Sequence, residues 1–189
     1  MGHLQNSLVV LAGGAGLVGR PLTRALLDAG ARVAVLSRTP GRLVLAAGAE
    51  GHPWEALPGL VEEASAVVNL AGEGLGDRRW TAHRKQVLQA SRIQTTTRIG
   101  TAIGAARKPP ETWVNASAIG FYGHRPEAPC EEDSPPGAGF LPDLCRAWEA
   151  AAGPIRGVRG VQLRLGGVLA REGGALPRLA LPAQCLVGT

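Results

Sequence analysis

The segment LVVLAGGAGLVG, residues 8–19, joins an apolar run directly to a glycine-rich loop. An apolar run without alternation is typical of a strand buried on both faces of a parallel sheet. From Leu17 to about Ala29 the apolar side chains recur at helical spacing, and Gly30 ends that pattern. The segment therefore predicts a strand, a glycine turn and a helix in direct succession.

The same alternation of apolar runs and helical patterns continues along the chain. Further strands are expected at 32–37, 66–70, 112–116 and 161–165, and further helices at about 80–106 and 140–152. Residues 39–60 contain too many glycines and prolines for an assignment, and the pattern fades after Gly174. Strands that alternate with helices predict an α/β fold, a Rossmann-type doubly wound parallel sheet with flanking helices.

Composition and charge limit the partners of this chain. It has 189 residues, of which 45% are hydrophobic, enough for one domain with a buried core. The net charge is +5, and 18 of the 20 basic residues are arginines scattered along the sequence. Because no recognition motif accompanies this charge, we expect an arginine-rich surface and no nucleic-acid partner.

The sequence contains no pattern for a membrane anchor or a metal site. No apolar run reaches the roughly 18–20 residues of a membrane helix, and the first residues do not resemble a signal peptide. The cysteines Cys130, Cys145 and Cys185 and the four histidines show no metal-ligand spacing. We therefore expect a cytoplasmic protein without a membrane or metal partner.

The glycine loop predicts a site for the pyrophosphate of a dinucleotide. Gly13 permits the tight turn, Gly16 lets the backbone approach the phosphates, and Gly19 lets the helix pack closely on the strand. The N–H groups and the dipole at the helix start then face the anion. The expected cofactor-binding residues of this loop are Gly13, Gly14, Ala15, Gly16, Leu17, Val18 and Gly19. The alternative is a glycine-rich turn without a ligand.

The end of the second strand indicates which dinucleotide binds. An NAD site usually has Asp or Glu here, whereas this chain has Ser37 and Arg38. Arg38 can pair with a 2′-phosphate and Ser37 can donate a hydrogen bond to it. We therefore expect NADP(H) in preference to NAD(H), the alternative being a solvated arginine at a strand end.

Several motifs together give the chain a family resemblance. They are the Gly13, Gly16, Gly19 spacing and the segments NLAGE (69–73), RWT (79–81), SRIQTT (91–96), SAIGFYG (117–123), EDSPPG (132–137), FLPDLCRAWE (140–149) and GGALP (173–177). With these motifs the chain resembles the extended short-chain dehydrogenases/reductases. It looks most like their atypical "epimerase family" subgroup, which is similar to nucleoside-diphosphate-sugar epimerases.

The resemblance covers about residues 7–178 and implies an NADP(H)-binding oxidoreductase or epimerase of unknown substrate, with a sugar nucleotide as one candidate. Family members are longer and have a C-terminal substrate-binding part. We therefore expect residues 1–189 to be a truncated Rossmann domain, with a compact variant as the alternative. Dimerisation through the helices that flank the sheet is a further implication of the resemblance.

The superfamily's catalytic pattern is incomplete in this chain. Its members use an upstream Ser and a Tyr-x-x-x-Lys pair, in which the Tyr acts as the acid or base. Ser117 fits the Ser position, but Leu141 and Cys145 occupy the Tyr and Lys positions. Tyr122, the only tyrosine, is either a replacement acid or a packed side chain. The alternative to an enzyme is therefore a non-catalytic NADP(H)-binding sensor or scaffold.

Other candidate residues follow the later strands or lie on the long helix. Leu70, Ala71 and Gly72 are expected to approach the cofactor, while Glu73 either bonds it or caps the next segment. Arg92 shares a helix face with apolar residues, so its guanidinium needs either a cofactor anion or backbone carbonyls.

Gly167 and Val168 are expected beside the nicotinamide. The basic cluster Arg78, Arg79, Arg84 and Lys85 is either a solvated helix start or a contact for an acidic substrate.

Overall fold

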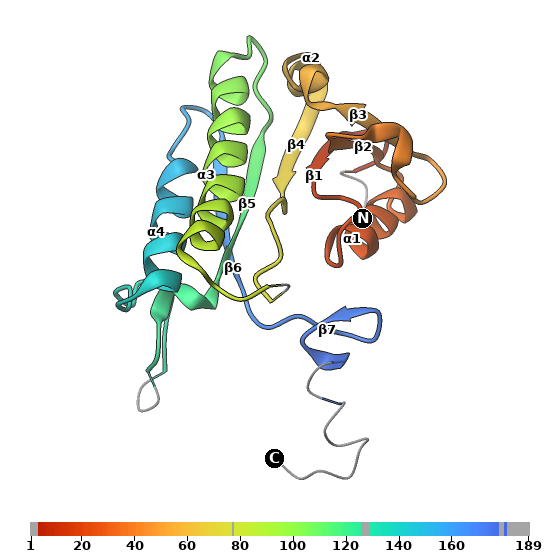
Figure 1. The fold of residues 1–189 in the computed structure, drawn as a ribbon. Coiled ribbons are helices and arrows are strands. Elements are labelled where there is room, and N and C mark those ends of the chain that lie inside the picture. The colour runs from red at the N-terminus through yellow and green to blue at the C-terminus, as the bar shows by residue number, and fades with distance from the viewer. Residues whose placement is uncertain (1–3, 77, 126–128, 178–179, 181–189) are drawn as a thin grey trace.

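The computed structural model describes residues 4–76, 78–125, 129–177 and 180. Its centre is a parallel sheet of six strands in the order β3-β2-β1-β4-β5-β6 (Figure 1). The strands are β1 (Leu8–Ala12), β2 (Arg32–Ser37), β3 (Ala49–Pro53), β4 (Ala64–Asn69), β5 (Thr112–Ala118) and β6 (Arg159–Leu165). The strand order reverses direction between β1 and β4, so the predicted doubly wound α/β fold is confirmed.

Helices cover both faces of this sheet. The helices are α1 (Gly19–Asp28), α2 (Leu57–Glu63), α3 (Ala82–Ala105) and α4 (Phe140–Ala151), with 3₁₀ turns η1 (Pro40–Arg42), η2 (Trp54–Ala56) and η3 (Ile119–Tyr122). Leu22 and Leu26 of α1 pack with Val9 and Leu11 on one face. The opposite face is covered by α2 and α3, and α3 and α4 lie side by side (Figure 1).

All five side chains of β1 are buried. Val9 and Leu11 belong to the core cluster beside α1, whereas Leu8, Val10 and Ala12 belong to the cluster beneath α2 and α3. Alternate residues of a strand point to opposite faces. A strand covered by helices on both sides therefore has an unbroken apolar sequence.

A strand and the start of a helix lie in residues 39–60, the stretch without a predicted assignment. β3, with the sequence AEGHP, pairs only with β2 at the sheet edge and is mostly exposed. An edge strand tolerates glycine and proline because one side of it needs no ladder partner. α2 begins with a proline in its first turn, which a helix accepts there because that N–H has no partner in any helix.

The last described elements form a small hairpin. β7 (Leu169–Ala170) and β8 (Gly173–Gly174) pair antiparallel after β6. Within the described ranges, no helix has both the length and the apolar character needed to cross a bilayer. Cys185 lies outside the described residues.

Candidate functional site

The predicted site residues gather at one edge of the sheet. Because all six strands run parallel, the segments that follow them emerge at their common carboxyl edge. The glycine loop follows β1, Ser37 ends β2, the 70–73 segment follows β4, and Ser117 lies in β5 just before Tyr122 in η3. Gly167 and Val168 follow β6. Residues from five separate strands are thus brought to one region, as in other doubly wound sheets.

The glycine loop packs so tightly that larger residues would not fit. Gly13 has φ +84°, and a Cβ there would lie 2.8 Å from the carbonyl carbon of Leu70. A Cβ on Gly19 would collide with the carbonyl oxygen of Gly13 and lie 2.7 Å from the Cα of Gly14. The loop therefore brings the start of α1 against the end of β1, and the end of β4 against both.

The start of α1 has the features of an anion site. The first turn contains no acidic residue, so its N–H groups and helix dipole face no competing carboxylate. The loop is fixed from within: the Gly16 N–H donates to the Gly13 carbonyl (3.0 Å), and the Thr23 hydroxyl donates to the Gly14 carbonyl (3.3 Å). A glycine turn that leads into the N-terminus of a helix is the arrangement that binds phosphate groups in many proteins.

Ser37 and Arg38 lie at the end of β2, the strand that pairs with β1. The Ser37 Oγ accepts a hydrogen bond from the Thr39 N–H at 3.0 Å, which leaves its own O–H free to donate. Arg38 is exposed, and the described part of the chain offers it no ion-pair partner. Both side chains thus keep hydrogen-bond donors that the described residues do not use.

Arg92 lies against the segment that follows β4. It is 7% exposed and donates to the carbonyl oxygens of Leu88 and Glu73, each at 3.0 Å. A Cβ on Gly72 would lie 3.2 Å from the guanidinium carbon. Burial lowers the pKa of the Arg92 guanidinium. Backbone carbonyls thus satisfy part of this arginine, and its place against Gly72 keeps it beside the predicted cofactor segment.

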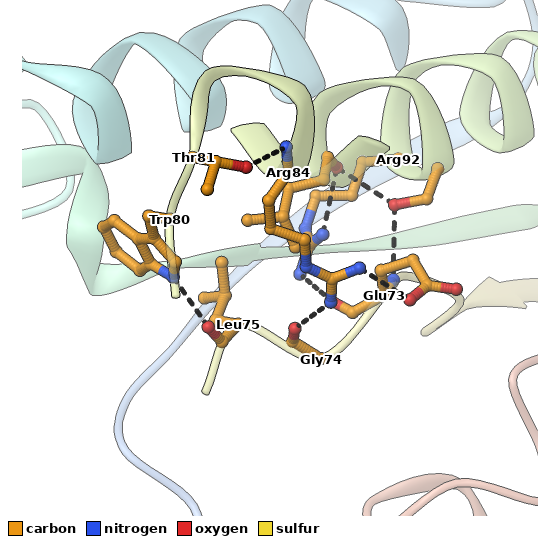
Figure 2. Close-up of polar contacts among 9 residues, drawn as sticks. Glu73, Gly74, Leu75, Trp80, Thr81, Arg84 and Arg92 are labelled. Carbon is orange, nitrogen blue, oxygen red and sulfur yellow. Dashed lines mark hydrogen bonds and ion pairs between the residues drawn. The ribbon is translucent and has the colours of Figure 1, made fainter. Parts of the chain in front are cut away.

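Arg84 ties Glu73 and Gly74 to the start of α3, as Figure 2 shows. Its Nη1 lies 3.1 Å from the Glu73 carboxylate and its Nη2 donates to the Gly74 carbonyl at 2.7 Å. Arg84 is 8% exposed, and its Nε has no partner among the described residues. For Arg84, the expectation of a solvated side chain in a basic cluster was wrong, because Glu73 and Gly74 draw the guanidinium inward.

The same segment is fixed at two further points. The Glu73 N–H donates to the Ser91 hydroxyl at 3.2 Å, and the Trp80 indole N–H donates to the Leu75 carbonyl at 2.7 Å (Figure 2). The Thr81 side chain caps α3 by accepting from the Arg84 N–H. Residues 73–75 of the segment after β4 are therefore held by α3 and by Trp80, which precedes it.

Ser117 lies at the end of β5 and points toward α4. It is 2% exposed, and its hydroxyl donates to the Glu149 carboxylate at 2.6 Å. Glu149 also accepts two bonds from Arg164 of β6, from Nε at 2.8 Å and from Nη2 at 2.9 Å. Burial alone would raise the pKa of Glu149, but the hydrogen bonds from Arg164 and Ser117 lower it overall.

Tyr122 belongs to the same network. Its phenolic oxygen accepts a hydrogen bond from Arg164 Nη1 at 2.8 Å, and the Arg164 guanidinium carbon lies 3.6 Å from the centre of the Phe121 ring. The hydrogen bond with Glu149 raises the pKa of Arg164, so this arginine stays charged. The structure thus joins the two predicted catalytic residues through Glu149 and Arg164.

Glu149 and Arg164 were not among the predicted site residues, although two signals point to them. Glu149 follows Cys145 by four residues and Leu141 by eight, so all three share one face of α4. Arg164 is in register with Ser117 across the β5–β6 ladder. Expected strand pairing would have brought it to the site.

Leu141 and Cys145 lie where α4 meets η3. A Cβ on Gly120 would lie 3.4 Å from the Leu141 Cβ and 3.8 Å from the Cys145 Sγ. Burial raises the pKa of the Cys145 thiol, so this side chain is a neutral, packed group. Neither residue can supply the proton or the positive charge of a Tyr-x-x-x-Lys pair.

The hairpin β7–β8 approaches the glycine loop. A Cβ on Gly173 would lie 3.4 Å from Leu17 Cδ1, and the Ala175 N–H donates to the Val168 carbonyl at 3.2 Å. Gly167 and Val168 therefore run between the end of β6 and a hairpin that contacts the loop. This places them on the same side of the sheet as the predicted pyrophosphate site.

Comparison with known proteins agrees with this geometry. A model of the NAD dependent epimerase/dehydratase family matches residues 9–140. An epimerase family protein of Mycobacterium leprae is 37% identical over 183 residues, which are 93% of this chain and 57% of that protein. The predicted resemblance to epimerase-family short-chain dehydrogenases is confirmed.

Solved structures match over almost the whole chain. The crystal structure of human epimerase family protein SDR39U1 with NADPH has a TM-score of 0.84 and 34% identity, covering 96% of this chain and 61% of that one. A nucleoside-diphosphate sugar epimerase from Corynebacterium glutamicum has a TM-score of 0.78 and 32% identity, covering 95% and 38%. The chain spans less than two thirds of the length of each of these relatives. By its sequence motifs, its sheet and the family model that it matches, this chain belongs to the NAD dependent epimerase/dehydratase family.

Proposed function

We propose that this chain binds NADP(H) at the carboxyl edge of its sheet and serves a hydride-transfer reaction of the epimerase/dehydratase type. The observation that supports this best is the cradle at Gly13–Gly19, which is closed by backbone contacts from within and free of acidic residues at the helix start. The N–H groups of the loop and α1 would hold the pyrophosphate. Leu70, Ala71, Gly72 and Arg92 would line the adjoining riboses, Glu73 would orient Arg92 through its carbonyl, and Gly167 and Val168 would border the nicotinamide.

The preference for NADP(H) rests on Ser37 and Arg38. Between Arg32 and Arg42 the chain has no carboxylate to accept from a ribose 2′-OH. An exposed arginine and a serine O–H suit a 2′-phosphate instead. The human relative's structure contains NADPH, which supports the same choice here.

Thermal unfolding with each cofactor tests this proposal. A ligand that binds only the folded state stabilises it by about 2.7 kcal/mol at a hundredfold excess over its Kd. We expect NADPH to raise the Tm more than NADH does. Arg38→Ala should remove most of that difference, whereas Arg156→Ala, an exposed arginine between α4 and β6, should leave it unchanged. A folded protein whose Tm neither cofactor moves would contradict the proposal.

A non-catalytic NADP(H)-binding role is the second candidate, because Leu141 and Cys145 replace the usual proton relay. In the catalytic case Ser117 would position the substrate oxygen and Tyr122 would supply the proton. A sugar nucleotide is the substrate class to test first, given the name of the C. glutamicum relative. Oxidation of NADPH by a panel of sugar nucleotides and carbonyls, lost in Ser117→Ala, would decide for catalysis.

Measurement of the molecular mass in solution would test the expected homodimer.

A further inference from the structure

We propose that Arg164 is the cationic partner of Tyr122, and that these two residues take the part of the Tyr-x-x-x-Lys pair that Leu141 and Cys145 cannot play. This inference rests on the proposed function. Tyr122 would be the catalytic acid or base, and Arg164 a positioning residue that acts through it. The two residues come from η3 and β6 rather than from one turn of α4.

The direction of one hydrogen bond supports this assignment. An arginine side chain has only donors, so the 2.8 Å contact requires Arg164 Nη1 to donate and the Tyr122 oxygen to accept. The phenolic proton is therefore not used in this contact. Within the described residues no hydrogen bond has Tyr122 Oη as its donor. Tyr122 is only partly buried, so its proton is available to an incoming oxygen.

Arg164 is held firmly in the position that this role requires. Its Nε and Nη2 form a two-point pair with Glu149, and Nη1 also donates to the Glu132 carbonyl at 2.8 Å. Its guanidinium carbon lies 3.6 Å from the Phe121 ring centre, in a cation–π contact. Because the planar guanidinium is fixed on three sides, its Nη1 cannot turn away from Tyr122. The cation is therefore preorganised beside the phenol.

The location of Tyr122 agrees with the role. A Cβ on Gly120, two residues earlier in η3, would lie 3.4 Å from the Cβ of Leu141, which stands at the superfamily's tyrosine position. The Tyr122 phenol thus belongs to a turn that packs against Leu141, where the superfamily has its tyrosine. A tyrosine from η3 can approach the same edge of the sheet from β5 instead of from α4.

Tyr122 would transfer its phenolic proton to the oxygen of the substrate. In the reduction of a carbonyl substrate, NADPH would supply a hydride to the carbonyl carbon when it is bound. The carbonyl oxygen gains the electron pair of its π bond and takes the proton of Tyr122, so the phenolic O–H breaks and an alcohol O–H forms. The phenolate oxygen keeps its bond from the charged Arg164 until water returns a proton. Oxidation of the alcohol uses the same groups in the reverse direction.

A spectroscopic test is available because Tyr122 is the only tyrosine. Tyrosine labelled with ¹³C at Cζ gives one resonance, which reports the hydrogen bonding of this phenol alone. We expect saturating NADPH to shift that resonance in the wild-type chain. Arg164→Met should shift the resonance of the free protein and reduce its response to NADPH, and Arg164→Lys should restore part of that response. Arg156→Met, which replaces an exposed arginine, should behave as wild type.

The outcomes separate this inference from the proposed function. If NADPH raises the Tm but leaves the wild-type resonance in place, Tyr122 is remote from the cofactor and the pairing is overturned, while cofactor binding stands. The same holds if Arg164→Met leaves the resonance unchanged. If NADPH does not raise the Tm, the proposed function itself fails. Should Arg164→Met not fold, the wild-type response to NADPH and the Arg164→Lys variant still decide the question.

Discussion

Gly19 stands where α1 begins, and its missing side chain is a packing requirement. A Cβ there would collide with the Gly13 carbonyl oxygen, a backbone atom that cannot turn aside. Gly104, in the last turn of α3, has nothing within 4 Å of the same position. A methyl group would therefore clash at Gly19, whereas Gly104 has room for one.

We expect Gly19→Ala to lower the free energy of unfolding by about 1–3 kcal/mol, the usual cost of overpacking. Gly104→Ala should raise it by about 0.5 kcal/mol, because alanine has the higher helix propensity. Urea unfolding followed by circular dichroism measures both. Equal effects of the two substitutions would show that the loop can move to accommodate a side chain.

Thr96 is the centre of a buried polar cluster behind the site. Its hydroxyl accepts from the Asn69 amide and from the Trp148 indole, each at 2.9 Å, and donates to the Asn115 oxygen at 3.3 Å. A hydroxyl has one donor and two acceptor positions, so every position is filled. The cluster joins α3 and α4 to the end of β4 and to the middle of β5.

Thr96→Val keeps the shape of the side chain but removes both acceptor positions. It leaves the Trp148 indole N–H without a partner, which should cost about 1–3 kcal/mol of unfolding free energy. Thr97→Val, at the exposed neighbouring position, should change it by no more than about 0.5 kcal/mol. Thermal and urea unfolding of the two variants give the comparison, and a loss shared equally by both would refute the hydrogen-bond explanation.

At the scale of elements, α4 is attached to the sheet by charge as well as by apolar contact. Glu149 of α4 pairs with Arg164 of β6, and their side chains are 15% and 20% exposed. Ser117 of β5 donates to the same carboxylate. The Glu149 carboxylate therefore joins α4 to two neighbouring strands, to β6 by an ion pair and to β5 by a hydrogen bond.

This arrangement predicts a pH dependence. Since the folded pKa of Glu149 is lowered, its contribution is complete above the unfolded value of about 4.3 and is lost as the pH falls through the folded pKa. Glu149→Gln should therefore cost about 2 kcal/mol at pH 7, the usual value of a hydrogen bond to a charged group, and the difference from wild type should shrink in acid. Glu63→Gln, at an exposed position of α2, is the matched control. A difference that is constant from pH 7 to pH 3 would argue against the ion pair as its source.

At the scale of the whole molecule, the two cores meet only through the sheet. β1 lies between β2 and β4, and all of its residues are buried. β3 lies at the edge and is mostly exposed. Stability should therefore be highest at the centre and fall toward the edge.

Hydrogen exchange followed by mass spectrometry tests this order. Amides of β1 should exchange only through global unfolding, whereas those of β3 and of the β7–β8 hairpin should exchange by local opening, at least about tenfold faster. Equal protection of β1 and β3 would mean that the sheet opens as a single unit.

Local periodicity and glycine spacing were enough to predict the central strands and the succession of strand, glycine loop, helix and second strand, because these features depend on short-range patterns. The candidate cofactor residues follow from the same patterns and stay a prediction. The remaining features arise from contacts between distant segments. β3 is a strand because β2 offers it a partner, although its own residues favour none. Arg84 is buried because Glu73 and Gly74 reach it from the segment after β4, and Glu149 meets Arg164 because α4 packs against β5, the strand beside β6. Such pairings join residues far apart in the chain, and their energies depend on distance and burial, which the local sequence does not specify.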